Sequence, residues 1–243
     1  MTSHHLLTIR LDDLSDQELD QTVLSYLNGT GSKIIVTPNP EFLLLARRDK
    51  EFAELLNRAD LSLPDGFGLK LAARLNGFSL HRHTGVDTLE QLMRTAGDRQ
   101  ILLLGSKESV EASKIFFQQK YPDLKIQIFD PGHVSDSGEA EEKIIFEIKN
   151  FAPAILAVGL GQGKQERFIA KYLPKLPSIC IAIGVGGAFD MISGKKPRAP
   201  RFMRQIGLEW LWRLVIEPKR WQRIMRAVII FPIIVICDKL RRH

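Results

Sequence analysis

Two short polar segments interrupt apolar sequence, and both carry side chains that could act on a hydroxyl-rich substrate. Thr37 and Asn39 are each followed by a proline, which fixes the backbone and stops a strand, so these side chains are presented at a strand end. Asp65 lies in a Pro-Asp-Gly sequence, which by itself is also typical of an ordinary turn. At a strand end, its carboxylate could accept a proton from a hydroxyl, which makes Asp65 the candidate general base.

Two other segments contribute cationic and amide groups. His81 and His83 have a spacing compatible with a metal site, but no third ligand has a convincing spacing nearby, so solvated histidines are the better interpretation. Arg82 between them could contact a phosphate or a sugar. Gln165 and Glu166 stand where a helix is expected to begin and suit a hydroxyl-rich ligand, although Glu166 is also favoured in any first helical turn.

Glycines follow several apolar runs and argue against the commonest nucleotide sites. The pairs Gly159-x-Gly161 and Gly184-x-Gly186 lack the third glycine of a dinucleotide fingerprint, and no Walker A sequence is present. Each loop alone could be a tight turn. Together, at one sheet edge, they let the backbone approach a phosphorylated ligand near helix N-termini.

The elements that must position these residues alternate along the chain. This alternation predicts an α/β fold, a Rossmann-like domain with a mainly parallel sheet whose carboxyl edge holds the ligand. Short β-branched runs predict strands at 33–37, 100–104, 125–129, 154–158 and 178–183. Helical spacing is found at 41–57, 109–121, 140–150 and 165–173.

The charge of the chain is concentrated at its C-terminal end. The 243 residues carry 34 Lys and Arg and 28 Asp and Glu, a net charge of +6. Residues 201–243 hold 10 of the basic and 3 of the acidic groups (net +7), which leaves 24 and 25 (net −1) before them. A composition break at 195–200 therefore suggests a catalytic domain at 1–196 and a basic helical appendage at 197–243.

Composition excludes several other classes. With 44% hydrophobic and 26% charged residues the chain is globular, and two cysteines are too few for a disulfide scaffold and indicate a reducing compartment. The first residues lack a secretory signal pattern, and no run reaches the ~20 apolar residues of a spanning helix. There is also no Asp-x-Asp pair, with which many sugar-nucleotide enzymes hold a metal.

Seven ordered motifs resemble the WecG/TagA/CpsF glycosyltransferases over roughly residues 30–225. They are the segments 37–41, 63–68, 82–87, 158–166, 187–190, 198–200 and 207–214, which read TPNPE, LPDGFG, RHTGVD, VGLGQGKQE, GAFD, RAP and GLEWLWRL. The sequence departs from the family pattern at Gly163, where the family usually has proline, and at His81 and His83, where it usually has Glu and Val.

The resemblance implies an inverting, metal-independent transferase that moves a sugar from a UDP-sugar to an undecaprenyl-diphosphate-linked N-acetylglucosamine. N-acetylmannosamine is the expected sugar; N-acetylmannosaminuronic acid, glucuronic acid and glucose are the alternatives. The products of such enzymes feed teichoic acid and other cell-surface polysaccharides. It also implies site residues: catalytic Asp65, Thr37, Asn39, Arg82 and Gln165; donor-binding Gly105, Ser106, Gly159, Gly161, Glu166, Gly187 and Asp190; and Arg213, Arg220 and Arg223 of the appendage for the acceptor or diphosphate.

The appendage is expected to meet an anionic membrane, because a lipid-linked acceptor stays in the bilayer. Its basic residues, its three tryptophans and the apolar segment Ala227–Cys237 suit a helix lying in the interface on the cytoplasmic face of the bacterial inner membrane. The alternative is a helix packed on the core of the protein.

Two other function classes and the oligomeric state stay open. A membrane-bound UDP-sugar-binding protein without activity would need the same donor site. A nucleic-acid binder would use the basic aromatic tail, but the apolar run beside it favours lipid, so no nucleic-acid partner is expected. A homo-oligomer, in which the apolar tail covers another subunit, is the alternative to a monomer.

Overall fold

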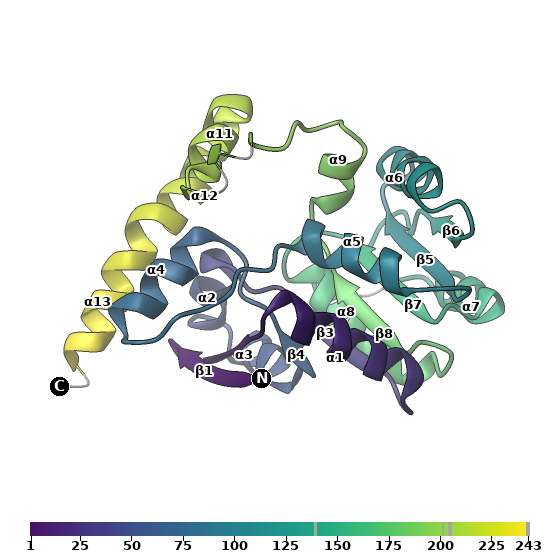
Figure 1. Cartoon of the computed structure of the whole chain (residues 1–243), viewed down its shortest axis with the longest axis horizontal. Helices are drawn as coiled ribbons and strands as arrows, with labels where there is room; N and C mark the ends of the chain where they lie inside the picture. The colour runs from purple at the N-terminus through teal and green to yellow at the C-terminus, as the bar shows by residue number, and fades with distance from the viewer. Residues whose placement is uncertain (139, 201, 204–205, 242–243) are drawn as a thin grey trace.

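A twisted parallel sheet forms the centre of the computed structural model, which describes residues 1–138, 140–200, 202–203 and 206–241 (Figure 1). In this described part, six strands run in the order β4-β3-β8-β7-β5-β6, and every neighbouring pair is parallel. The strands are β3 (Lys33–Val36), β4 (Leu61–Ser62), β5 (Gln100–Gly105), β6 (Lys125–Phe129), β7 (Ile155–Gly159) and β8 (Ile181–Gly184). The five expected strands are confirmed; the short β4 was not among them, although a strand end before Asp65 was considered.

An N-terminal hairpin, which the sequence analysis did not anticipate, packs beside the sheet. It consists of β1 (Thr2–Leu6) and β2 (Ile9–Asp13), paired antiparallel. The fully buried Asp12 ties it to β4, because its carboxylate accepts hydrogen bonds from Ser62 N (2.8 Å) and from Ser3 Oγ (2.7 Å). The hairpin therefore supports β4, the strand that leads to Asp65.

Helices connect the strands and begin at recognisable caps. Ser15 and Glu18 form a capping box at α1, Asn39 caps α2 and Thr84 caps α5. The helices are α1 (Asp16–Asn28), α2 (Pro40–Ala46), α3 (Lys50–Arg58), α4 (Phe67–Leu75), α5 (Gly85–Thr95), α6 (Lys107–Lys120), α7 (Glu142–Phe151), α8 (Lys164–Tyr172) and α9 (Ala188–Ile192), with a 3₁₀ turn at Leu173–Lys175.

The single helix expected at 41–57 is wrong: the structure has two helices there, α2 and α3. The reason lies at Asp49, whose side chain accepts a hydrogen bond from Phe52 N (2.9 Å) and so starts a new helix. An aspartate at this position stabilises a helix N-terminus better than a helix interior.

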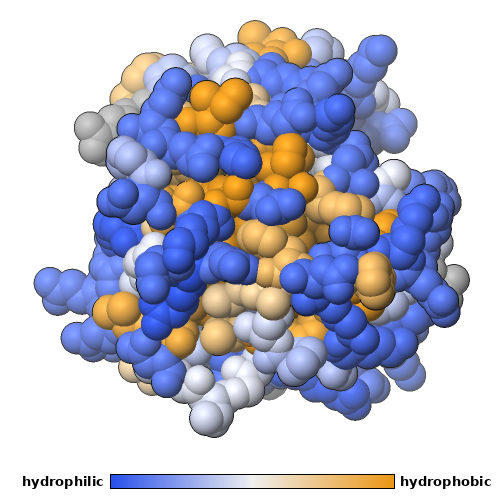
Figure 2. Space-filling view, turned by 90° about the vertical axis from the view of Figure 1, so that its right-hand side faces the viewer, coloured by the Kyte–Doolittle hydropathy of each residue, from blue (hydrophilic) through white to orange (hydrophobic). Residues whose placement is uncertain are grey.

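Helices cover both faces of the sheet, which confirms the Rossmann-like α/β expectation. One hydrophobic cluster joins the sheet to α1, α5, α6 and α9, a second joins it to α7 and α8, and a third contains residues of α2, α3 and α4. Figure 2 shows the face at the β6 edge, where apolar residues reach the surface among hydrophilic ones. Ile115, Phe116 and Phe146 are exposed on α6 and α7.

The C-terminal segment is helical, as expected, and runs beside α2 and α4 (Figure 1). It comprises α11 (Glu209–Ile216), a 3₁₀ turn (Pro218–Arg220), α12 (Trp221–Met225), a π-helical turn (Arg226–Ile230) and α13 (Phe231–Arg241). Phe231 and Val235 are fully buried in the cluster that also contains Phe42 and Leu69. The boundary predicted at residue 196 thus separates two segments that share a core.

The helix at Ala227–Cys237 has two different faces. Phe231 and Val235 point into the protein, as the packing alternative expected, whereas Ile229, Ile233 and Ile236 are 45%, 55% and 46% exposed. Within the described residues, no helix is both long and apolar enough to cross a membrane.

Candidate active site

One cavity of about 410 Å³ opens at the carboxyl end of the sheet. The segments that follow β3, β4, β5, β7 and β8 all contribute to its wall, and the C-terminal segment closes it from the other side. Among the predicted site residues, the cavity is lined by Thr37, Asn39, Asp65, Gln165, Ser106, Gly159, Gly161, Gly187, Asp190, Arg213, Arg220 and Arg223. Arg82, Gly105 and Glu166 are not part of this lining.

The segment after β3 presents its polar side chains as the prolines predicted. Asn39 Oδ1 accepts hydrogen bonds from Glu41 N (2.9 Å) and Phe42 N (3.2 Å) and thereby caps α2. The side-chain oxygen of Asn39 is therefore engaged, which leaves its side-chain NH₂ group as the one suited to contact a ligand. Thr37 is buried in the cavity wall close to Gly85.

Asp65 is held at the exit of β4. Its backbone N–H donates to Pro38 O (2.7 Å), which ties it to the segment after β3, and Gly66 follows with φ +97°, a conformation that favours glycine. Burial raises the pKa of Asp65 to about 6; Glu209 adds to this rise, while Arg213 opposes it. A carboxylate with this pKa suits a general base near neutral pH.

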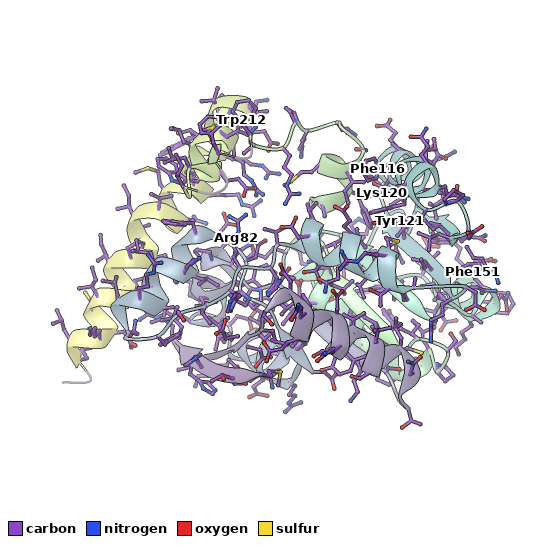
Figure 3. The ribbon with its side chains drawn as sticks, viewed as in Figure 1. Arg82, Phe116, Lys120, Tyr121, Phe151 and Trp212 are labelled. Carbon is purple, nitrogen blue, oxygen red and sulfur yellow. The ribbon has the colours of Figure 1, made fainter. Side chains whose placement is uncertain are left out.

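Arg82 lies behind the cavity wall, in contact with the C-terminal segment. Its guanidinium is 3.6 Å from Glu209 Oε2, and the other Glu209 oxygen accepts from Arg213 Nη2 at 2.9 Å. In Figure 3, Arg82 rises from the segment between α4 and α5 toward α11, which also carries Trp212. Arg82 therefore acts on the cavity through Glu209 and through its charge near Asp65.

Gln165 and Glu166 are both buried at the start of α8. Glu166 accepts hydrogen bonds from Gly163 N (2.7 Å) and Gln165 Nε2 (2.6 Å), and Gln165 Oε1 accepts from Gly186 N (2.9 Å). Burial raises the pKa of Glu166 to about 7, although these hydrogen bonds oppose the rise. Gln165 reaches the cavity, whereas Glu166 supports it from behind.

The glycines predicted to bind the donor have two different roles. Gly161 and Gly187 line the cavity, and a Cβ on either would meet no atom within 4 Å. In contrast, a Cβ on Gly159 would lie 2.6 Å from the Phe189 ring, and one on Gly105 would lie 3.3 Å from it. The absence of a side chain at Gly105 and Gly159 thus lets Phe189 pack under the cavity floor.

Asp190 lies at the wall of the cavity between Ser109 and Lys196. Its carboxylate accepts from Ser109 Oγ (2.6 Å) and pairs with Lys196 Nζ (2.7 Å). Burial by itself raises the pKa of Asp190, but these two partners lower it overall. Asp190 is therefore ionised and positions Lys196 through their ion pair. As a negative group, it is poorly suited to contact a phosphate directly.

Two cations of the cavity, Lys196 and Arg198, were missed as site residues because the segment 195–200 was interpreted as a domain boundary. Arg198 donates from Nη2 to Asp87 Oδ1 (2.6 Å), and its Nε is buried without a hydrogen-bond partner. Lys196 also pairs with Glu217 (3.3 Å). The basic run Lys-Lys-Pro-Arg directly after the short helix α9 was the signal in the sequence.

The appendage closes the cavity through ion pairs. Arg223 pairs with Glu41 of α2 and reaches Gln162 Oε1 at 3.4 Å, so it links α12 to helix α2 and to the cavity loop after β7. Arg220 lies 3.2 Å from Glu217. The three predicted appendage arginines thus meet at one cavity with Lys196 and Arg198.

His81 and His83, which flank Arg82, connect their segment to the end of β2 and the residue that follows it. His81 Nδ1 lies 2.9 Å from Asp13 Oδ1, and His83 is buried with Nε2 2.8 Å from Leu14 O, so the expectation of solvated histidines is wrong for His83. In the described part of the chain, no three His, Cys, Asp or Glu side chains gather as metal ligands. Metal independence stays a prediction.

The fold and this cavity define a class: a Rossmann-like α/β protein with a cation-rich ligand site at the carboxyl edge of its strands. A family model narrows the class. Residues 4–243 match the model of the WecG/TagA/CpsF glycosyl transferase family, and the chain belongs to that family.

Curated relatives agree with this assignment. The chain is 33% identical over 225 residues to a Bacillus subtilis protein, with 90% of this chain and 82% of that protein covered. It is 34% identical to one from Bacillus spizizenii, covering 88% and 84%, and 30% identical to one from Staphylococcus aureus, covering 91% and 86%. All three carry the name N-acetylglucosaminyldiphosphoundecaprenol N-acetyl-beta-D-mannosaminyltransferase.

Proposed function

We propose that this protein transfers N-acetylmannosamine from its UDP derivative to N-acetylglucosamine linked to undecaprenyl diphosphate, with Asp65 as general base and inversion at the anomeric carbon. The names of the relatives support the sugar and the acceptor. The observation that carries the proposal is the cavity itself, where one carboxylate with a pKa raised to about 6 shares a wall with five cationic side chains.

The reaction requires one proton acceptor and a site for the leaving diphosphate. Asp65 takes the proton of the acceptor hydroxyl while the oxygen of that hydroxyl forms a bond to the anomeric carbon of the donor sugar. The bond from that carbon to the diphosphate breaks, and the electron pair leaves with UDP. The cations that stabilise this charge are Lys196, Arg198, Arg213, Arg220 and Arg223.

The test is transfer from radiolabelled UDP-N-acetylmannosamine to a short-chain lipid-diphosphate-N-acetylglucosamine. We expect a lipid-linked disaccharide from the native protein and a loss of at least about a thousandfold in kcat for Asp65→Asn, with UDP binding retained. Asp123→Asn, at an exposed position between α6 and β6, is the matched control and should leave kcat unchanged. Turnover retained in Asp65→Asn would exclude its assignment as the base.

The identity of the donor is decided by the same assay with other UDP-sugars. UDP-N-acetylmannosaminuronic acid, UDP-glucuronic acid and UDP-glucose are the alternatives to include. A uronic acid would add a carboxylate to a cavity that already contains Asp65, Asp190, Glu209 and Glu217. We therefore expect the neutral N-acetylated sugar to give the highest kcat/KM.

We also propose that the protein acts at the cytoplasmic face of the bacterial inner membrane as a peripheral protein. The support is a surface, called here the α4–α13 surface, on which apolar side chains of α4 and the C-terminal helix are exposed. Its members are Phe67, Leu71, Leu75, Ile229, Ile233, Ile236 and Leu240. Apolar side chains with neighbouring basic residues suit the interface of an anionic bilayer.

The non-catalytic alternative, a membrane-bound UDP-sugar-binding protein, makes a different prediction. Such a protein would bind UDP and vesicles but form no lipid-linked disaccharide with any donor. Asp65 favours the enzyme, because a binding site for an anion gains nothing from a carboxylate whose pKa lies near 6.

A further inference from the structure

A line of three hydrogen bonds runs behind the cavity wall and connects two of its loops. It starts at Gly163 N, which donates to Glu166, continues from Gln165 Nε2 to Glu166, and ends at Gly186 N, which donates to Gln165 Oε1; the distances are 2.7, 2.6 and 2.9 Å. The loop after β7 is thereby linked to the loop after β8. Both loops contribute to the cavity, through Gly161 and Gly187.

The two side chains in this line have little freedom to move. Gln165 and Glu166 are each 2% exposed. A Cβ on Gly184 would lie 2.6 Å from Gln165 Nε2 and 2.7 Å from Glu166 Oε1, so the pair occupies the space that this glycine leaves. Neither side chain can therefore exchange its partners for water without a shift of the backbone.

The chemistry of the carboxylate determines which way the amide points. Above its pKa of about 7, Glu166 is an ionised carboxylate that only accepts hydrogen bonds, and both of its oxygens are engaged by donors. Gln165 must then direct its NH₂ group toward Glu166, which leaves its carbonyl oxygen for Gly186 N. Gly186 has φ +52°, and because glycine adopts positive and negative φ about equally readily, this hydrogen bond helps to select one backbone conformation among several.

We propose that Glu166 is a positioning residue, which acts through Gln165 to hold the Gly186–Gly187 peptide in the conformation that receives the donor diphosphate. This inference rests on the proposed function, since it concerns the same donor site. It gives Glu166 a role different from the direct donor contact expected from the sequence. Glu166 touches Gln165 and Gly163, and its effect reaches the ligand through the loop after β8.

The first test is Glu166→Gln, with UDP binding measured by calorimetry at pH 8, where the native Glu166 is ionised. The introduced amide has one acceptor and one donor end, so one of the three hydrogen bonds in the line is lost; if Gln165 turns over to accept from the new amide, the lost bond is that of Gly186 N. We expect the Kd for UDP to rise at least about tenfold, because a buried hydrogen bond is lost and the loop relaxes. An unchanged Kd would overturn the proposal.

The second test follows the Gly186 amide itself, by hydrogen exchange in the native protein and in Glu166→Gln. Gly186 N donates to Gln165 Oε1, and Gln165 is held by its own donation to Glu166, so we expect the Gly186 N–H to exchange at least about tenfold faster in the variant. Unchanged exchange at Gly186 would overturn the proposal.

Phe168→Leu is the matched control, because Phe168 is a fully buried residue of α8 that lies outside the cavity lining. It should lower the melting temperature and leave the Kd for UDP unchanged; if it weakened UDP binding as much as Glu166→Gln, general loosening of α8 would replace the positioning role. Failure of the native protein to bind UDP would instead contradict the proposed function.

Discussion

The surroundings of Asp65 act on its pKa in two opposite directions. The backbone of the β4 exit sets it into the cavity wall, where burial raises its pKa to about 6, and Arg213 and Arg82 limit that rise. Without the two arginines the pKa of Asp65 would be higher. Their positions therefore keep Asp65 ionised and still basic enough to accept a proton.

The first prediction concerns the pH dependence of transfer. Because only the ionised form of Asp65 accepts a proton, kcat/KM should fall about tenfold per pH unit below pH 6 and be nearly constant above it. The measurement is a pH series of initial rates at donor concentrations below KM. Arg213→Gln removes a charge that lowers the pKa of Asp65, so the acidic limb of its profile should move to higher pH.

The same pKa shift has a stability counterpart, which serves as a control. The folded pKa lies above the ordinary value of 3.8, so ionising Asp65 destabilises the native state increasingly as pH rises from about 4 to 6. Asp65→Asn should therefore raise the melting temperature by ~2–4 °C at pH 8, and this gain should shrink toward zero near pH 4. A gain independent of pH would contradict a raised pKa of Asp65.

Single residues also show where sequence interpretation reached its limit. Asp65 was indicated by its place after an apolar run, since the carboxyl ends of parallel strands share one edge. Lys196 and Arg198 were missed because a basic run with prolines is typical of a linker, and only the fold reveals that it passes over the cavity. Gly163 has φ +85°, and its N–H donates to Glu166. A proline, which the family usually has at this position, could neither adopt this φ nor donate this hydrogen bond.

At the scale of elements, hydrophobic patterning predicted the second half of the sheet well. Strands β5, β7 and β8 are nearly continuous buried runs bounded by turns, which is typical of central parallel strands, whereas the edge strand β6 is only partly buried. The hairpin and β4 were missed because β1 is largely exposed and β4 has only two residues. These elements are stabilised by the buried carboxylate of Asp12, a long-range contact that no local pattern reports.

The C-terminal helix provides the prediction that belongs to this scale. Ile233 and Ile236 are about half exposed on the α4–α13 surface, so replacing both with Glu should leave the fold intact and reduce binding to phosphatidylglycerol vesicles at least about tenfold. The measurement is vesicle flotation, with the melting temperature recorded for each variant. Full flotation of this double variant would contradict the proposed membrane surface.

Two further variants separate the faces of the molecule. Ile115→Glu changes an equally exposed apolar residue on α6, outside the α4–α13 surface, and should not affect flotation. Phe231→Ala removes a fully buried ring from the shared core and should destabilise the fold by about 3–5 kcal/mol. Together they distinguish a loss of membrane contact from a loss of folding.

At the scale of the whole molecule, basic residues of the last 43 positions lie in two different places. Arg213, Arg220 and Arg223 face the cavity, where they pair with carboxylates such as Glu41 of α2 and Glu217. Lys239, in contrast, lies on α13 and donates to Leu75 O at the end of α4, beside the exposed apolar residues. The appendage thus lines the candidate active-site cavity and also contributes to the proposed membrane surface.

This distribution leads to a prediction about metals. The described cavity wall contains the cations Lys196, Arg198, Arg213, Arg220 and Arg223, and each pairs with a carboxylate that an incoming diphosphate can replace. Arginine and lysine can therefore supply the positive charge that a divalent ion provides in other transferases. Dialysis against EDTA should leave kcat within about twofold of the untreated enzyme.

If the cavity cations bind the donor diphosphate, removing one of them should weaken donor binding. Arg198→Gln removes a cavity guanidinium whose Nε is buried without a hydrogen-bond partner, and it should raise the KM for the donor at least about tenfold. Added Mg²⁺ or Mn²⁺ should not restore it, because the described side chains offer no cluster of metal ligands. Loss of activity in EDTA, with recovery on adding either ion, would show that the protein depends on a metal and that these cations alone do not stabilise the leaving UDP.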